Sequence, residues 1–178
     1  RSHITAASRI SRLAVGDMGT SSVVTRFQPP PGISQSAHVE GLPLGTRGGL
    51  RVQHVFPLDA EYEFNIRRSG PNNFVLPYAG TRDPIEVAID GERVALIEAD
   101  KPTRIRLAVK AGSHTVQIAF LHTVAEQEVN DLYAVHAQSV SVGGFDLQGP
   151  LKPQGVGNTE SRRRIFICQP KAESEHNA

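Results

Sequence analysis

Hydrophobic and polar residues alternate with a period of two along most of this chain. Tyr62, Phe64 and Ile66 share one face of their segment, for example, while Glu61 and Glu63 take the other. Alternation of this kind is expected of β-strands with one buried and one solvated face. The same pattern covers segments 50–57, 61–66, 85–89, 104–109 and 115–120.

Turn residues separate these segments at short intervals. Asp90-Gly91 predicts a tight hairpin, and Ala111-Gly112-Ser113 predicts a second one between the runs that flank it. In 133–142 the apolar residues change from odd positions, such as Val135, to even positions, such as Val140. A β-bulge near Gln138 would account for this change. About eight or nine short strands without repeated helical crossovers are typical of an antiparallel sandwich. We therefore predict an all-β, jelly-roll-like β-sandwich.

One segment has a helical period instead. Ile4, Ala7, Ile10 and Leu13 fall on one stripe of residues 2–15, and Gly16 ends it. We expect residues 1–17 to be the helical tail of a preceding domain. Residues 18–168 would form the β-sandwich binding module, and residues 169–178 a C-terminal linker. The start of the chain has neither an initiator Met nor a signal peptide, so we expect the chain to be a fragment of a longer protein.

Three Gly- and Pro-rich segments do not fit the strand pattern, namely 28–49, 69–83 and 145–161. Loops of this length in a compact domain are usually functional or form a covering layer.

Composition and charge exclude several classes of function. Nineteen basic residues against eighteen acidic ones in 178 residues provide no excess charge for nucleic acid or an anionic membrane. No apolar run is long enough for a transmembrane helix. The basic run Arg162-Arg163-Arg164 is interpreted as the solvated flank of a strand.

Catalytic signatures are missing, so we expect no enzymatic activity. The sequence has no G-x-S-x-G, H-E-x-x-H, P-loop or C-x-x-C motif. Cys168 is the single cysteine. It is either a buried thiol, as the apolar run Ile165-Phe166-Ile167 before it suggests, or half of a disulfide to a cysteine elsewhere. His54 falls on an apolar strand face and is interpreted as a core histidine.

Residues 122–132 form the most informative loop. Three carboxylates and two amides lie close together without a lysine or arginine, and calcium prefers such oxygen ligands. A solvated acidic turn is the alternative. The candidate metal ligands are Glu126, Glu128, Asn130 and Asp131.

Aromatic platforms for sugar rings are scarce. There is no Trp, and Tyr62 is in phase with core residues, which leaves Tyr78 and Tyr133. The candidate ligand-binding residues are Tyr78, His122, Gln127 and Tyr133.

Two family resemblances extend these predictions. The hairpin in 85–94, the Ala-Gly-Ser-His-Thr-Val strand in 111–120 and Asn130-Asp131-Leu132-Tyr133 resemble calcium-dependent xylan-binding carbohydrate-binding modules. The resemblance implies a lectin-like β-sandwich with Asn130 and Asp131 in the calcium loop. An acidic residue of the family's last strand is replaced near Val135-His136.

The second resemblance covers nearly the whole chain. Residues 38–50, 56–62 and 161–168 are similar to the middle region of multidomain, cytochrome c-linked proteins of planctomycetes and related soil bacteria. It implies neighbouring domains on both sides and a partner cysteine further along the longer protein. A haem motif C-x-x-C-H is absent from this chain.

These observations favour a non-catalytic carbohydrate-binding module of an exported protein, in the periplasm, on the cell surface or outside the cell. Its partners would be a polysaccharide or oligosaccharide, xylan-like on the resemblance, and neighbouring domains. The alternative is a structural spacer that organises haem or catalytic domains and has no ligand of its own.

Overall fold

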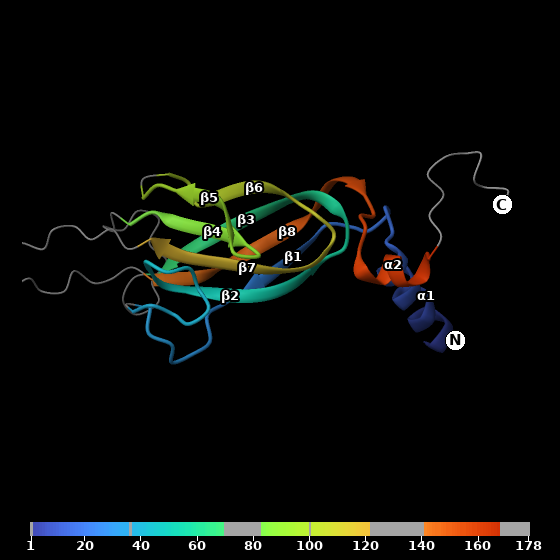
Figure 1. Cartoon of the computed structure of the whole chain (residues 1–178), viewed down its shortest axis with the longest axis horizontal. Helices are drawn as coiled ribbons and strands as arrows, with labels where there is room; N and C mark the ends of the chain where they lie inside the picture. Colours follow the sequence, from blue (N-terminus) through green and yellow to red (C-terminus); the bar gives the residue numbers. More distant parts are fainter. Residues whose placement is uncertain (1, 36, 70–82, 100, 122–140, 168–178) are drawn as a thin grey trace, which may run out of the picture.

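Two four-stranded antiparallel sheets pack face to face, with two helices at one end (Figure 1). The computed structural model describes residues 2–35, 37–69, 83–99, 101–121 and 141–167. The elements are α1 (Ser2–Val15), β1 (Val23–Phe27), β2 (Thr46–Phe56), β3 (Asp59–Ser69), β4 (Ile85–Ile89), β5 (Glu92–Ile97), β6 (Arg104–Val109), β7 (Gly112–Leu121), β8 (Ser141–Gly155) and α2 (Glu160–Ile165).

The strand order confirms the predicted sandwich. The first sheet, sheet A, has the order β1-β8-β3-β6, and the second, sheet B, has the order β2-β7-β4-β5. Every strand pair is antiparallel. Eight strands in two sheets with this interleaved order form a jelly roll.

The predicted alternation becomes the core. Tyr62, Phe64 and Ile66 of β3 are at most 2% exposed, and they face Val116, Ile118 and Phe120 of β7 across the interior. These residues supply apolar surface from both sheets, and its burial is the main force that holds the two layers together.

The two ends of the sandwich differ. At the helix end, the short turns at Pro57, Asp90-Gly91 and Ala111 join successive strands, and α1 and α2 lie beyond them (Figure 1). We call the opposite end the loop end. There the strands meet the longer connections, which are residues 28–45, 70–84, 98–103 and 122–140.

The predicted N-terminal helix is confirmed, and a second helix was not predicted. Arg162, Arg163 and Arg164 lie in α2, so their interpretation as a strand flank is wrong. Thr159 caps this helix by accepting a hydrogen bond from the Arg162 amide. The apolar run before Cys168 is exposed at Ile165, by 51%, and at Ile167, by 93%, and the predicted burial of Cys168 stays a prediction. Cys168 itself lies outside the described residues.

Residues 145–161 were expected to be irregular, but most of them belong to β8, a central strand of sheet A. The glycines in this strand reflect close packing. A Cβ at Gly149 would lie 2.1 Å from Tyr62 Cδ1, and one at Gly143 would lie 2.1 Å from Ser69 Oγ. Only glycine lets the β8 backbone pass at these distances.

The two predicted turns have different outcomes. Asp90 and Gly91 have φ values of 53° and 85° and join β4 to β5 in a hairpin, as predicted. Ala111-Gly112-Ser113 does not form a hairpin, because β6 belongs to sheet A and β7 to sheet B. The Ala111 amide instead donates to Asp59 Oδ1 at 2.7 Å and fixes this crossover. The bulge predicted near Gln138 lies outside the described residues.

The described part of segment 28–49 covers one outer face. Gln117 Nε2, on the outer side of β7, donates to the Gly41 carbonyl at 2.7 Å, and Leu42 is 6% exposed. Gln35 bonds both the amide and the carbonyl of Gly49. The segment is therefore a covering layer over sheet B at the loop end. Neither described helix is long and apolar enough to cross a membrane.

Candidate functional site

The residues that the sequence singled out lie outside the described part of the chain. This holds for the four candidate ligand-binding residues and the four candidate calcium ligands: Tyr78, His122, Gln127, Tyr133, Glu126, Glu128, Asn130 and Asp131. They stay predictions. Within the described ranges, no three His, Cys, Asp or Glu side chains are placed to hold a metal ion. His54, interpreted as a core histidine, is half-buried: it lies between the rings of Phe27 and Phe56, and burial lowers its pKa.

The described loop end is built around one buried and one partly buried arginine. Arg68 takes the inward phase of β3, is 4% exposed and donates to the Ala99 carbonyl at 2.6 Å. Burial lowers its pKa. Arg47 lies over the Phe120 ring at 4.8 Å and pairs with Asp83 at 2.7 Å. Both guanidinium groups hold the strand ends together, which is a structural role.

An open, polar surface lies on the outside of sheet A. We call it the polar face and define it as two adjacent rungs of outward side chains. One rung is Arg26, Asp146, Asn65 and Arg104, and the other is Val24, Gln148, Glu63 and Arg106, in the strand order β1-β8-β3-β6. At the usual strand spacing the four-strand rung spans about 14 Å.

The charged groups of the polar face pair with one another. Arg26 makes a forked contact with Asp146, with Nε 2.9 Å from Oδ1 and Nη2 3.3 Å from Oδ2. The hydrogen bond from Arg26 is the main cause that lowers the Asp146 pKa. Arg106 Nε donates to Glu63 Oε2 at 2.8 Å, and Arg104 lies near the other oxygen at 3.5 Å.

Two amides on the polar face are available to a ligand. Neither the Asn65 nor the Gln148 side chain hydrogen-bonds another described residue, whereas the charged groups around them are paired. An amide offers donors and an acceptor on one flat group. Ionised carboxylates and guanidinium groups beside it add acceptors and donors. The polar face can therefore bind an uncharged, polyhydroxylated molecule along its length.

The polar face is open to solvent. Arg26, Arg104 and Arg106 have side chains 65%, 64% and 58% exposed. The outer face of sheet B is covered at its loop end by residues near Gly41 and Leu42, while Gln53 and Val55 of β2 stay exposed. An open, flat surface suits an extended chain better than a small molecule, which is usually bound in a concave pocket.

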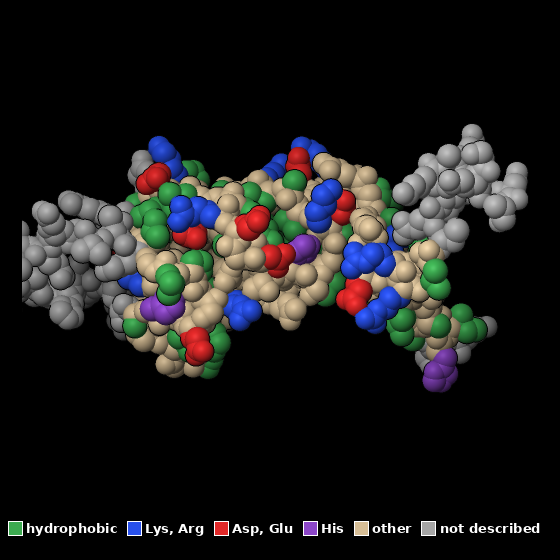
Figure 2. Space-filling view, in the orientation of Figure 1, with side chains coloured by type: hydrophobic (Ala, Val, Ile, Leu, Met, Phe, Trp, Pro, Cys, Tyr) green, Lys and Arg blue, Asp and Glu red, His purple; other side chains and the backbone are tan. Residues whose placement is uncertain are grey.

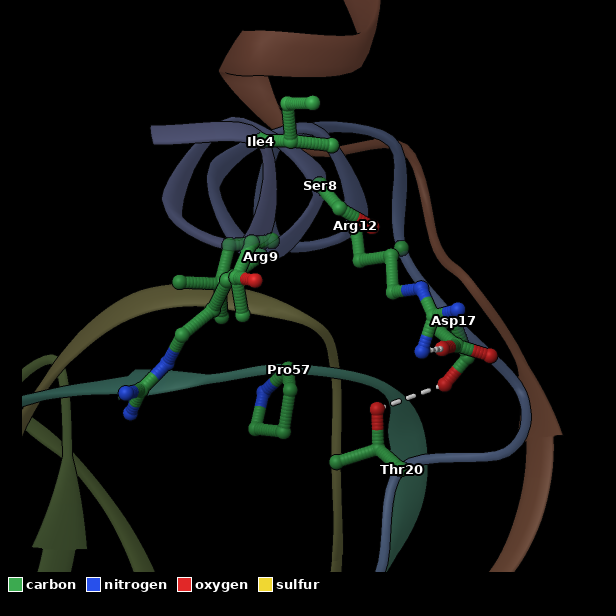
Figure 3. A pocket seen from close by; sticks show the side chains of 10 residues that line it. Ile4, Ser8, Arg9, Arg12, Asp17, Thr20 and Pro57 are labelled. Atoms are coloured by element: carbon green, nitrogen blue, oxygen red, sulfur yellow. Dashed lines mark hydrogen bonds and ion pairs between the residues drawn. The ribbon is translucent and has the colours of Figure 1, made fainter. Parts of the chain in front are cut away.

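A separate hollow lies at the helix end. It has a volume of about 560 Å³ and lies between α1 and the β2–β3 turn at Pro57. Arg9 extends from α1 on the side of Pro57, whereas Arg12 reaches Asp17, with which it pairs at 3.6 Å (Figure 3). No nucleophile–base pair lines the hollow, so we assign it no catalytic chemistry.

The sequence contained part of the signal for the polar face. Glu61, Glu63 and Asn65 were placed opposite the core residues of their strand. The neighbouring strands could not be inferred, and β8, which contributes Asp146 and Gln148, had been expected to be irregular. Alternation identifies the outward residues of one strand but does not identify the strands beside it.

Comparisons with known proteins add little to this description. No family model and no curated protein sequence matches the chain. Among solved structures, the chain is similar to a family 35 carbohydrate-binding module from Clostridium thermocellum. The sequences are 8% identical, the TM-score is 0.33, and the alignment covers 71% of this chain and 90% of that chain. The fold assignment rests on strand order and register. The resemblance to cytochrome c-linked proteins stays a prediction.

Proposed function

We propose that this protein is a non-catalytic carbohydrate-binding module that holds a polysaccharide chain on the polar face of sheet A. The observation that carries the proposal is the exposed strip in which the Asn65 and Gln148 amides lie free among paired charges. Sugar hydroxyls both donate and accept hydrogen bonds, so planar amides, carboxylates and guanidinium groups suit them. Export to the periplasm, the cell surface or the medium, where polysaccharides occur, belongs to the same proposal.

The absence of tryptophan narrows the kind of ligand. Binding to a crystalline polysaccharide uses a flat strip of aromatic side chains. None of the eight positions of the polar face is aromatic. We therefore expect a soluble, single polysaccharide chain, and xylan is the first to test.

The test is calorimetric titration of the chain with soluble xylan, mixed-linkage glucan and mannan. We expect the double variant Asn65→Ala/Gln148→Ala to weaken binding by about tenfold or more, because two amide contacts are lost. Gln53→Ala is the matched control, since this exposed amide lies on the outer side of β2 in sheet B. The melting temperature of each variant should stay at the wild-type value, because all three side chains are on the surface.

Calcium dependence is a separate part of the proposal and has its own readout. If the predicted loop holds calcium, adding calcium should raise the melting temperature, because a ligand bound only to the folded state stabilises it. Asp131→Ala should abolish that rise. If sugar binding persists in the presence of a chelator, calcium dependence is contradicted and the carbohydrate-binding proposal stands.

If no polysaccharide gives a binding signal in calorimetry, the carbohydrate assignment is contradicted and the structural spacer is favoured. Binding that is unchanged in the Asn65/Gln148 double variant would place the ligand elsewhere, with the loop residues as the next candidates.

A further inference from the structure

The hollow between α1 and the β2–β3 turn has the size of a small-molecule site. Its volume of about 560 Å³ lies within the range of roughly 300–1,000 Å³ that such sites usually have. A single water molecule occupies about 30 Å³ of the liquid. The hollow therefore has room for an organic molecule of many atoms, and the polysaccharide proposal makes no use of it.

The position of α1 is fixed at its C-terminal end. Arg162 Nη1, from α2, donates to the Val15 carbonyl, the last of α1. Gly16 has φ of 87°, and a Cβ there would lie 2.7 Å from the Val156 Cβ, so only glycine allows this close contact. Before this anchor every side chain of residues 3–13 is exposed. Since α1 buries none of them against the β2–β3 turn, the hollow between the two stays open.

Arg9 is the unpaired charge of the hollow. It extends from α1 on the side of Pro57 (Figure 3) and makes no hydrogen bond or ion pair with another described residue. Arg12, by contrast, pairs with Asp17 at 3.6 Å. Within the described ranges these two arginines and one aspartate are the charged residues that line the hollow, so its formal charge is +1. A ligand with one negative charge would neutralise the hollow, whereas a dianion would bring a second negative charge near Asp17.

The hollow also has an apolar lining. Ile4 and Leu13 of α1 contribute to it, together with Pro57 of the β2–β3 turn. Ile4 is 77% and Leu13 is 68% exposed, and Figure 2 shows apolar side chains beside Lys or Arg side chains at this end of the molecule. Covering exposed apolar surface is favourable by about 25 cal/mol per Å². A ligand with an apolar body next to its charge can therefore use both kinds of lining.

We propose that this hollow binds a small amphipathic monocarboxylate. The carboxylate would lie on the Arg9 guanidinium, a planar group that can donate two parallel hydrogen bonds to the two carboxylate oxygens. The apolar body would lie between Leu13 and Pro57, which line the same hollow. Phosphate and sulfate also match a guanidinium, but they have no apolar part to cover these two side chains.

Such a ligand should stabilise α1. The helix has 14 residues, and a helix of this length that packs few side chains is marginal in water. The ligand would contact α1 and the β2–β3 turn together, so it would bind only while the helix is folded against the sandwich. Ligand binding should therefore raise the temperature at which the helical signal of α1 is lost.

The test is a nuclear magnetic resonance titration of the full chain with 3-phenylpropanoate, which joins one carboxylate to an apolar ring. Two matched probes each lack one part, since 3-phenylpropanamide has no charge and acetate has no apolar body. We expect both to bind at least about tenfold more weakly than 3-phenylpropanoate. Circular dichroism in the presence of 3-phenylpropanoate should show the helical signal persisting to a higher temperature.

Two pairs of variants locate the site. Arg9→Gln should weaken binding of 3-phenylpropanoate by about tenfold or more. Arg163→Gln, in α2 at the same end of the molecule but outside the lining of the hollow, should leave it unchanged. Leu13→Ser should also weaken binding. Its control is Ile10→Ser, because Ile10 is similarly exposed, at 66%, and lies on the same helix but does not line the hollow.

Three outcomes would overturn the monocarboxylate site. The first is no binding of 3-phenylpropanoate, or equal binding of its neutral amide. The second is equal binding of acetate, which would indicate a contact with the charge alone. The third is an equal effect of Arg9→Gln and Arg163→Gln, which would indicate attraction to the basic end as a whole. None of these readouts involves polysaccharide, so the monocarboxylate site and the proposed function are tested independently.

Discussion

Tyr62 shows how one residue can serve both packing and hydrogen bonding. It is the bulkiest of the fully buried side chains in the described part of the sandwich, at 1% exposure. Its ring meets Phe56 edge-on at 4.7 Å, and its hydroxyl donates to the Leu58 carbonyl at 2.9 Å. Burial is the main cause that raises the pKa of Tyr62 to about 12.

Tyr62→Phe should therefore have two measurable effects. Loss of the hydroxyl should lower the free energy of unfolding by about 1–2 kcal/mol at neutral pH. The usual pKa of a tyrosine hydroxyl is about 10. Above that pH the hydroxyl of Tyr62 ionises in the unfolded chain, but it stays protonated in the folded state because the folded-state pKa is raised. Stability should thus fall as pH rises from 10 toward 12 in the wild type.

The variant lacks the ionisable group, so its stability should fall less steeply over the same pH range. Urea unfolding at a series of pH values measures both effects. Parallel slopes for the two proteins would show that Tyr62 ionises equally in both states.

At the scale of the element, the start of β2 depends on a glycine bulge. The register with β7 shifts between Arg47 and Leu50. Gly49 has φ of 105°, and a Cβ there would lie 2.1 Å from the Ile118 carbonyl oxygen. The bulge brings the β2 backbone this close to β7, which only glycine allows.

Gly49→Ala should destabilise the protein by about 3 kcal/mol or more, because backbone strain and a backbone clash add. Gly45→Ala is the matched control. Gly45 also has a positive φ, of 79°, but a Cβ there would meet nothing within 4 Å, so we expect a loss of only about 1 kcal/mol. Urea midpoints measure the difference, and equal losses would mean that β2 can shift to relieve the clash.

At the scale of the whole molecule, the stability of the sandwich does not depend on packing against α1 or α2. The core cluster consists of strand residues and Leu58, and no described residue of α1 or α2 belongs to it. β1, by contrast, pairs with β8 along five residues, and Phe27 stacks on the buried Phe145 at 4.8 Å. The sandwich should not need α1 for its stability.

Deletion of residues 1–15 should accordingly lower the free energy of unfolding by less than about 1 kcal/mol, while the helical signal in circular dichroism falls to that of α2. Deletion of residues 1–27 is the control. It also removes β1, so it should destabilise the sandwich severely. A large loss with the shorter deletion would show that α1 supports the core.

The alternation of apolar and polar residues was sufficient to predict the β class, the buried faces of five strands and the Asp90-Gly91 hairpin. The period of residues 2–15 was sufficient to predict α1. These features depend on local geometry, in which strand faces repeat every two residues and helix faces about every 3.6. They can therefore be read from the chain without knowing what each element contacts.

Only the tertiary structure decided which strands are neighbours, and with that which outward residues meet. It placed Asn65 beside Asp146 and Gln148 beside Glu63 on one open face. It made a central strand of β8, whose glycines serve close approach to Tyr62 and Ser69. It also left the stripe of α1 uncovered. A periodic pattern specifies the face that should be buried, but the surface that buries it comes from elsewhere in the chain or from another molecule.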